Sequence, residues 1–188
     1  NPMCMNMIGI NKLIPDIKSV GLCHSVQGTA EMLADDLNED IQDIEFKCAG
    51  INHMAFYLEF SKKMKDGTKK DLYPNLKDLA YKISEGNDEL SSRAKVERPE
   101  GHKMKHLTER VRYEILKRFG FFVTESSEHF AEYVPWFIKK NRDDLIDRFQ
   151  IPIDEYRDRC EYSIKKWQDY SKTLKEESKL ETYRSNEY

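Results

Sequence analysis

Two short stretches of the chain carry side chains that can bind a transition metal. Cys23 follows the apolar residues of a Gly-Leu-Cys-His-Ser stretch, and His53 follows those of a Gly-Ile-Asn-His stretch. In α/β proteins ligands bind beyond the carboxyl ends of strands, so Cys23 and His53 can share one metal ion there. By ligand preference alone, sulfur and nitrogen favour zinc or iron. The alternative interpretation is a buried cysteine and a histidine that caps a helix.

The composition excludes several classes of function. The chain has 188 residues, of which 35% are charged and 39% hydrophobic, and a formal net charge of -3. This balance predicts one domain over residues 1–188, and it favours neither nucleic acid nor an anionic membrane as a partner. No apolar run reaches the roughly 20 residues of a membrane-spanning helix, and no secretory signal is evident. We therefore expect a cytoplasmic protein whose four cysteines, which form no CxxC pair, are reduced thiols.

Three stretches resemble the family-four glycoside hydrolases. They read VGLCHSVQGT at 20–29, CAGINHMA at 48–55 and FVTESSEHFAEY at 122–133. The third stretch narrows the resemblance to the α-galactosidase branch, and the likeness covers essentially the whole chain. It implies the C-terminal, substrate- and metal-binding part of a Rossmann-type glycosidase from the superfamily of lactate and malate dehydrogenases. Such a family is an exception among glycosidases, because it does not use the usual pair of carboxylates.

The resemblance implies hydrolysis by an oxidation and an elimination. NAD takes a hydride from C3 of the sugar, a base removes the C2 proton, and the glycosidic oxygen leaves before water adds and the hydride returns. Mn²⁺ is expected to hold O2 and O3 and to stabilise the negative charge, and Cys23 and His53 fall where the family places its metal ligands. No GxGxxG turn occurs in the chain. The NAD site is therefore expected mostly upstream of residue 1, and this chain alone is expected to be inactive.

The general acid that protonates the leaving group is expected next to the metal-binding cysteine. His24 directly follows Cys23, at a position where some relatives carry an aspartate proposed to protonate the leaving group. An imidazolium can do the same work, because histidine titrates near neutrality. The alternative is a histidine that caps a helix or binds a sugar hydroxyl.

The base that removes the C2 proton is expected on a helix at 104–119, where relatives carry a tyrosine or an aspartate. Tyr113 is the candidate and Glu114 is its competitor. A free phenol titrates near about 10, so Tyr113 needs the metal or a cation such as Arg112 to lower its pKa. The alternative is a tyrosine in the core of an amphipathic helix.

Four residues are expected to bind the substrate, an α-galactoside. Asn1 matches the family's substrate-binding asparagine, and Asn52 lies beside the metal-binding histidine. Ser127 and His129 lie in a polar stretch between aromatic residues, which fits contact with galactose or with a neighbouring subunit of a homo-oligomer. The alternative for this stretch is the cap of a helix, with a serine answered by a later acid.

Three rival functions remain. A related α-glucosidase or 6-phosphoglycosidase is close, although the matching loops hold no distinctive basic cluster for a phosphate. A hydroxy-acid dehydrogenase shares the Asn-Pro turn but lacks its catalytic His and Arg signatures here. A non-catalytic assembly domain would use the aromatic-rich helices to pack subunits.

We expect an α/β fold, richer in helix than in strand, to position these candidate site residues. Hydrophobic periodicity, caps and turn residues indicate most of the elements. We expect helices at 2–13, 25–37, 74–84, 104–119 and about 154–178, and another that starts at Ser126 or Ser127 and reaches Phe137. We expect extended segments at 20–23, 44–60 with a break at 49–53, and 121–123, a turn at 65–67 and a loop at 85–103.

Overall fold

A small antiparallel sheet forms the centre of the molecule. The computed structural model describes residues 2–19, 25–51, 53–95, 108–153 and 155–177. Strands β1 (Ile44–Ile51) and β2 (Met54–Lys63) form a hairpin. The other side of β2 pairs with β3 (Lys69–Asp71) near its end and with β4 (Phe122–Val123) near its start. The fold is thus mixed and rich in helix, as expected, and all strand pairs among the described residues are antiparallel.

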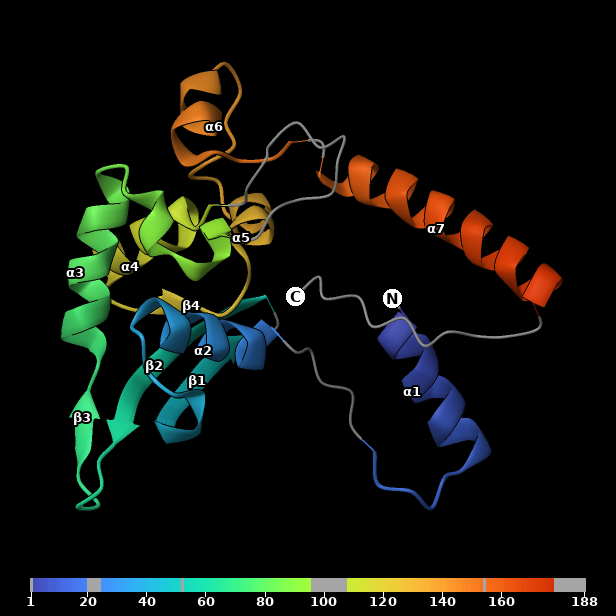
Figure 1. The fold of residues 1–188 in the computed structure, drawn as a ribbon, viewed down its shortest axis with the longest axis horizontal. Helices are drawn as coiled ribbons and strands as arrows, with labels where there is room; N and C mark the ends of the chain where they lie inside the picture. Colours follow the sequence, from blue (N-terminus) through green and yellow to red (C-terminus); the bar gives the residue numbers. More distant parts are fainter. Residues whose placement is uncertain (1, 20–24, 52, 96–107, 154, 178–188) are drawn as a thin grey trace.

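Three helices cover this sheet and share one core with it. Helix α2 (Ser25–Asp36) lies in front of β1 and β2 in Figure 1, and α3 (Tyr73–Ser84) and α4 (Arg110–Phe119) lie beside the sheet. The core includes Leu33 of α2, Leu76 of α3, and Tyr57 and Phe60 of β2. Burial of such side chains is the main source of stability, at about 1.5–3 kcal/mol for each large apolar side chain.

A second core lies on the other side of α4. Val111 and Ile115 of α4 pack there with Phe130 of α5 (Ser127–Tyr133) and Phe149 of α6 (Asp143–Phe149). Helix α4 therefore lies between two cores, and six of its ten residues are buried.

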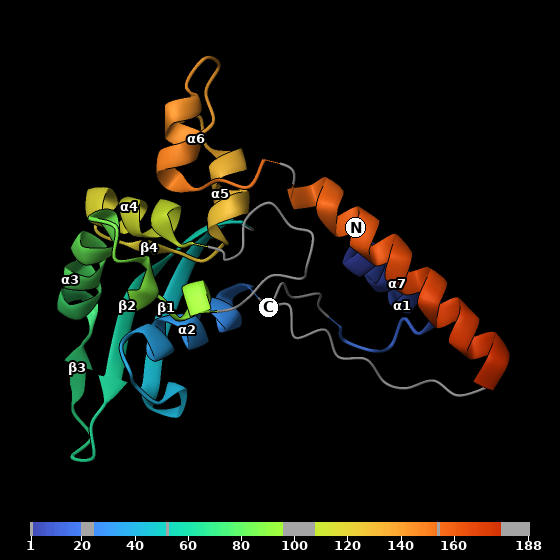
Figure 2. The same ribbon diagram turned by 45° about the horizontal axis from the view of Figure 1, so that its top comes forward.

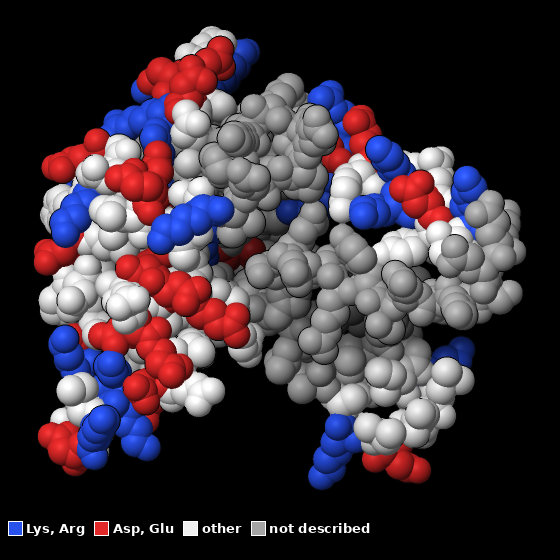
Figure 3. Space-filling model, viewed as in Figure 1, with Lys and Arg blue, Asp and Glu red and all other residues white. Residues whose placement is uncertain are grey.

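Two helices extend away from this body. Helix α1 (Pro2–Leu13) and the long helix α7 (Glu155–Glu177) lie apart from the sheet in Figures 1 and 2. In the described part of the chain, no helix combines the length and the apolar character needed to cross a membrane. On the face shown in Figure 3, lysine and arginine alternate with aspartate and glutamate over much of the described surface.

Most predicted elements are confirmed, and the differences have physical reasons. The helix expected at 104–119 has Thr108 and Glu109 outside it, because the Glu109 carboxylate binds arginines instead of capping the helix. Gly120 ends that helix as expected, with a φ of 81° and its N–H bound to the carbonyl oxygen of Leu116. The expected loop at 85–103 contains two short 3₁₀ helices, Asp88–Leu90 and Ser92–Lys95. A third 3₁₀ helix, Ile41–Asp43, lies outside this loop and precedes β1.

Two further differences concern the C-terminal helices. Helix α5 begins after its cap Ser126, as expected, but it ends at Tyr133, well before Phe137. Helix α6 was not predicted, because only one of its seven residues is buried and its sequence carries little hydrophobic periodicity. The segment expected to be extended at 20–23 lies outside the described residues.

The expected break at 49–53 is a tight hairpin turn. Pairing between β1 and β2 continues to Ile51 and Met54, so only two residues connect the strands. His53 in this turn has a φ of 64°, in the left-handed region that two-residue hairpins require. Gly50 has a φ of 139°, and a Cβ there would lie 2.5 Å from the Cα of Ala55. The sequence thus places His53 at the tip of the hairpin through a glycine that allows close approach of the strands.

Candidate functional site

The structure describes five of the residues singled out in the sequence. These are His53, Tyr113, Glu114, Ser127 and His129. The other four, namely Cys23, His24, Asn1 and Asn52, lie outside the described residues, so their roles stay predictions.

The three stretches that carry the family resemblance meet at one junction. The Thr29 hydroxyl, on α2, donates to the carbonyl oxygen of Thr124 at 2.8 Å. The backbone N–H of Thr124 in turn donates to the carbonyl oxygen of Ala55 at 3.0 Å, two residues after His53. Segments around residues 29, 55 and 124 are therefore joined by direct hydrogen bonds. This brings the start of α2, the hairpin tip and the start of α5 to one place.

The hairpin tip contacts the start of α5 through a cluster of rings. The His53 ring lies 6.3 Å from that of His129 and 5.4 Å from that of Tyr133, measured between ring centroids. Nδ1 of His53 pairs with Oε2 of Glu125, whose side chain is only 9% exposed, while the His53 side chain is 28% exposed. The structure thus brings His53 and His129 together, and it adds a carboxylate that the sequence had not singled out.

Ser126 caps α5, so the helix cap in the alternative interpretation is confirmed, although the residue that Ser126 binds is His129 and not an acid. Its hydroxyl accepts from the backbone N–H of His129 and lies 2.9 Å from Nδ1 of the same residue. Its own N–H donates to Oε1 of Glu125 at 2.9 Å. A cap of this kind stabilises a helix by about 1 kcal/mol. Contact of His129 with a sugar stays a prediction.

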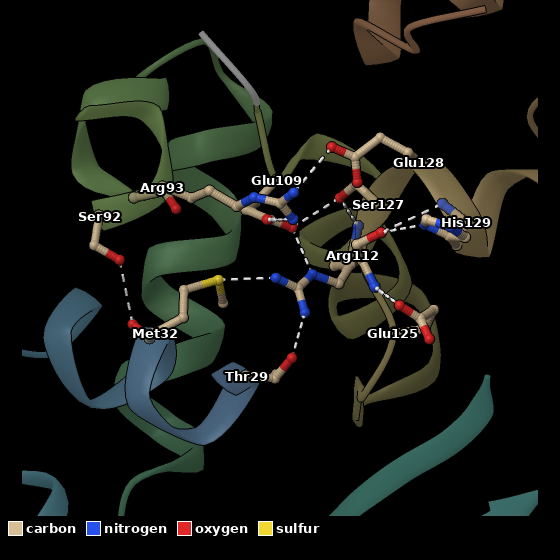
Figure 4. Close-up of polar contacts among 12 residues, drawn as sticks. Thr29, Met32, Ser92, Arg93, Glu109, Arg112, Glu125, Ser127, Glu128 and His129 are labelled. Carbon is tan, nitrogen blue, oxygen red and sulfur yellow. Dashed lines mark hydrogen bonds and ion pairs between the residues drawn. The ribbon is translucent and has the colours of Figure 1, made fainter. Parts of the chain in front are cut away.

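A buried charge network lies beside this cluster (Figure 4). Arg112 is 2% exposed, and its Nε donates to Oε2 of Glu109 at 2.5 Å while Nη1 donates to the Thr29 hydroxyl at 2.7 Å. The Ser127 hydroxyl also donates to Oε2 of Glu109, at 2.8 Å. Arg93 approaches Oε1 of the same carboxylate at 2.8 Å. The network ties α2 and the start of α5 to α4, and it gives Ser127 a structural role; its contact with substrate stays a prediction.

The arginines govern the protonation of Glu109. Burial alone would raise the pKa of this wholly buried carboxyl. The charges of Arg112 and Arg93 outweigh burial, with added hydrogen bonds from Arg112 and Ser127, and they lower the pKa to about 2. Glu109 is therefore a carboxylate at neutral pH, and its charge is compensated inside the protein.

The structure does not give Tyr113 the surroundings expected of a base. Its side chain is fully buried in the first core, and its hydroxyl donates to Oδ2 of Asp36 at 2.5 Å. Burial raises the pKa of Tyr113 well above its ordinary value, and the Asp36 carboxylate raises it further. Arg112 acts in the opposite direction but is the smallest of these influences. Arg112 thus does not bring the pKa of Tyr113 below its ordinary value, and the alternative of a core tyrosine agrees with the geometry, while the role of Tyr113 as the base stays a prediction.

Glu114 is also held within the fold. Its side chain is 5% exposed, and Oε1 pairs with Arg118 one turn later at 2.6 Å. Neither Tyr113 nor Glu114 contacts the ring cluster at the hairpin tip through a hydrogen bond or ion pair within the described residues.

Replacement of Tyr113 by phenylalanine is expected to affect stability rather than turnover. Loss of the hydroxyl leaves the half-buried Asp36 carboxylate with one partner fewer, which costs about 1–3 kcal/mol of unfolding free energy. Denaturant unfolding and kcat, both measured on the variant, check this. A large drop in kcat with unchanged stability would restore Tyr113 as the base.

The sequence offered one signal for the carboxylate that was missed. Glu125 stands inside the third resembling stretch, directly before the two serines considered as caps. An acidic residue beside a cap is common, so its type alone does not predict a contact with a histidine 72 positions earlier. Arg112 was noticed only as a neighbour of Tyr113, because the network partners on α2 are distant in sequence.

The described residues fit a metal only in part. They contain no group of three or more histidine, cysteine, aspartate or glutamate side chains that could hold one. His53, however, has Nδ1 against a carboxylate, which is the usual arrangement of a metal-binding histidine. Cys23, the other expected ligand, is outside the described residues. For NAD, the sequence holds no glycine-rich phosphate-binding turn, so these residues do not fit the dinucleotide.

Comparison with known proteins identifies what this arrangement is similar to. A family model described as the family 4 glycosyl hydrolase C-terminal domain matches residues 48–188, and one described as family 4 glycosyl hydrolase matches residues 1–39. The chain is 42% identical to an alpha-galactosidase of Bacillus subtilis over 188 residues, which are 100% of this chain and 38% of that protein. The chain thus spans well under half of this relative.

Two solved structures share the fold. The crystal structure of lplD from Bacillus subtilis, named as a glucosidase, matches with a TM-score of 0.58 and 23% identity over 93% of this chain and 38% of that one. A 6-phospho-alpha-glucosidase from gut microorganisms, solved in complex with NAD and Mn²⁺, matches with a TM-score of 0.51 and 14% identity over 99% of this chain and 39% of that one.

Proposed function

The chain belongs to the family 4 glycosyl hydrolases, and from this premise we propose that the whole protein hydrolyses α-galactosides. The family follows from a match over residues 48–188, and the substrate from the 42% identity to an alpha-galactosidase. The observation that carries the proposal is the junction of Thr29, Ala55 and Thr124. It joins the three stretches of the chain that resemble the family most, although they are far apart in sequence.

We propose Mn²⁺ and NAD as the cofactors of the whole protein. A structural relative was solved with both, and the paired Nδ1 of His53 fits a metal-binding histidine. Cys23 and His53 would hold the metal, which supplies charge stabilisation at the sugar oxygens when bound. The residues that hold NAD belong to another part of the protein.

The remaining roles are proposed from the family resemblance. His24, next to Cys23, would protonate the leaving oxygen, and Asn1, Asn52 and His129 would bind galactose hydroxyls. The hydroxyl of Ser127 is engaged by Glu109, so it would act through the position of α5. No base is assigned, because Tyr113 is buried against Asp36. A homo-oligomer in the cytoplasm remains part of the proposal.

The test is hydrolysis of an aryl α-galactoside by the longest natural form of the protein that contains this chain. A reductant is kept present, and NAD and Mn²⁺ are added singly and together. Turnover only with both is the expected result. Turnover with neither would contradict the proposed mechanism, and turnover of the aryl α-glucoside or its 6-phosphate alone would contradict the proposed substrate.

A further inference from the structure

The Glu125 carboxylate lies between the hairpin tip and the start of α5, and it has not yet been given a role. Glu125 is 7% exposed, and it does not lie among the ligands and acids considered for the reaction. Its two oxygens are held separately. Oε1 accepts from the backbone N–H of Ser126 at 2.9 Å, and Oε2 lies against Nδ1 of His53.

The contact with His53 is exclusive on both sides. Oε2 of Glu125 and Nδ1 of His53 are both buried from water, and among the described residues neither atom has a hydrogen-bond partner beyond this ion-pair contact. A buried carboxylate oxygen and a buried ring nitrogen left unpaired would each cost about 1–3 kcal/mol, so a proton between them is favoured. A carboxylate can only accept, so the proton must lie on Nδ1.

From this geometry we infer that Glu125 is a positioning residue, which holds His53 as the tautomer protonated on Nδ1 and leaves Nε2 as its metal ligand. The backbone makes this arrangement rigid at both ends. His53 lies in a two-residue turn with a φ of 64°, and Glu125 is bound by the N–H of the residue that caps α5. Within the described part of the chain, Nε2 of His53 has no hydrogen-bond partner, so it is the nitrogen open to a cation.

The Glu125 carboxylate would also strengthen His53 as a metal ligand. A negative charge on the far side of an imidazole raises the basicity of the opposite nitrogen, and loss of such a partner typically weakens metal binding about 10- to 100-fold. The neighbouring rings of His129 and Tyr133 limit rotation of His53, so the carboxylate sets the tautomer while the rings set the plane. This inference rests on the proposed function for the identity of the metal, but not for the tautomer.

The first measurement is the tautomer of His53 in the metal-free protein, read from the ¹⁵N shifts of the ring at a pH where it is neutral. We expect the proton on Nδ1 in the natural protein and mostly on Nε2 in Glu125→Ala. A proton on Nε2 in the natural protein would overturn the inference without any variant. An unchanged tautomer in folded Glu125→Ala would overturn it too.

The second measurement is the affinity for Mn²⁺, followed by electron paramagnetic resonance without substrate. The matched pair is Glu125→Gln and Glu132→Gln, because Glu132 is an exposed carboxylate on α5, which begins just after Glu125, and each change removes one charge. We expect Glu125→Ala to bind Mn²⁺ about 10- to 100-fold more weakly. Glu125→Gln, which keeps the size and an acceptor, should keep the tautomer and lose less affinity, while Glu132→Gln should bind as the natural protein does.

The outcomes separate this inference from the proposed function. Equal Mn²⁺ affinity in Glu125→Gln, Glu125→Ala and Glu132→Gln would overturn the inference even if α-galactosides are hydrolysed with Mn²⁺ and NAD. Conversely, the expected tautomer and loss of affinity with no hydrolysis of α-galactosides would support the inference and contradict only the proposed function.

Discussion

Replacement of Arg112 by methionine is expected to lower the free energy of unfolding by about 3–5 kcal/mol, because it leaves a buried charge uncompensated. Arg112 is 2% exposed, and the Glu109 side chain that it binds is wholly buried. Methionine keeps the unbranched apolar stem of arginine but lacks its guanidinium, so the loss combines the charge and its hydrogen bonds with the space that the guanidinium fills. Of the described partners of Glu109, the Ser127 hydroxyl and Arg93 would remain, and Arg93 is the one charge among them, with a side chain that is 25% exposed.

The measurement is urea unfolding at neutral pH, with two controls. Arg142→Met removes an arginine that pairs with Asp144 at 2.6 Å on the exposed surface, and we expect the unfolding midpoint to stay unchanged. The double variant Arg112→Met with Glu109→Gln removes both charges, so it should be more stable than the sum of the two single losses predicts. A loss below about 1 kcal/mol in Arg112→Met would show that the network does not stabilise the fold.

The second large effect is expected on acidification. Glu109 has a pKa of about 2 in the folded protein against an ordinary 4.5, because the two arginines outweigh burial. A lowered folded pKa means that the unfolded chain binds the proton more tightly. The contribution of Glu109 is therefore fully present above about pH 4.5 and is lost as the pH falls towards about 2. Its size is on the order of 3 kcal/mol.

This prediction is checked by the unfolding free energy of the natural protein and of Glu109→Gln from pH 6 down. Between pH 4.5 and 2, stability should fall more steeply in the natural protein, by the equivalent of about one bound proton. The comparison cancels the contribution of other groups such as Asp36, whose raised pKa acts with the opposite sign. Parallel curves for the two proteins would refute the assignment.

The sequence was sufficient for elements whose signals are local. The break expected within 44–60, the end of α4 at Gly120 and the cap of α5 at Ser126 all depend on residues within a few positions, although pairing of β1 continues through 49–51 and narrows the break. The role of Tyr113 was not predictable in this way. Helix α4 carries apolar residues towards two cores, so its periodicity cannot indicate which of its faces meets solvent.

The charged groups of the site were harder still to predict. Glu109 precedes a helix and Arg112 stands three residues later, a pattern typical of an exposed pair on a helix surface. Only the long-range contacts with Thr29 and Ser127 make this pair buried and structural. The same holds for Glu125, whose partner His53 comes from the hairpin tip.

The junction of Thr29 with Thr124 has a consequence for the order in which the chain folds. The two residues are 95 positions apart, so a ribosome adding about 5–20 residues per second needs roughly 5–20 s between them. The hairpin of β1 and β2 closes within microseconds of its release and can meet α2 in the first core, whereas the hydrogen bond of Thr29 must wait for Thr124. The junction is therefore completed late in synthesis, and a chain that stalls before residue 124 presents α2 and the hairpin to chaperones without the segment that joins them.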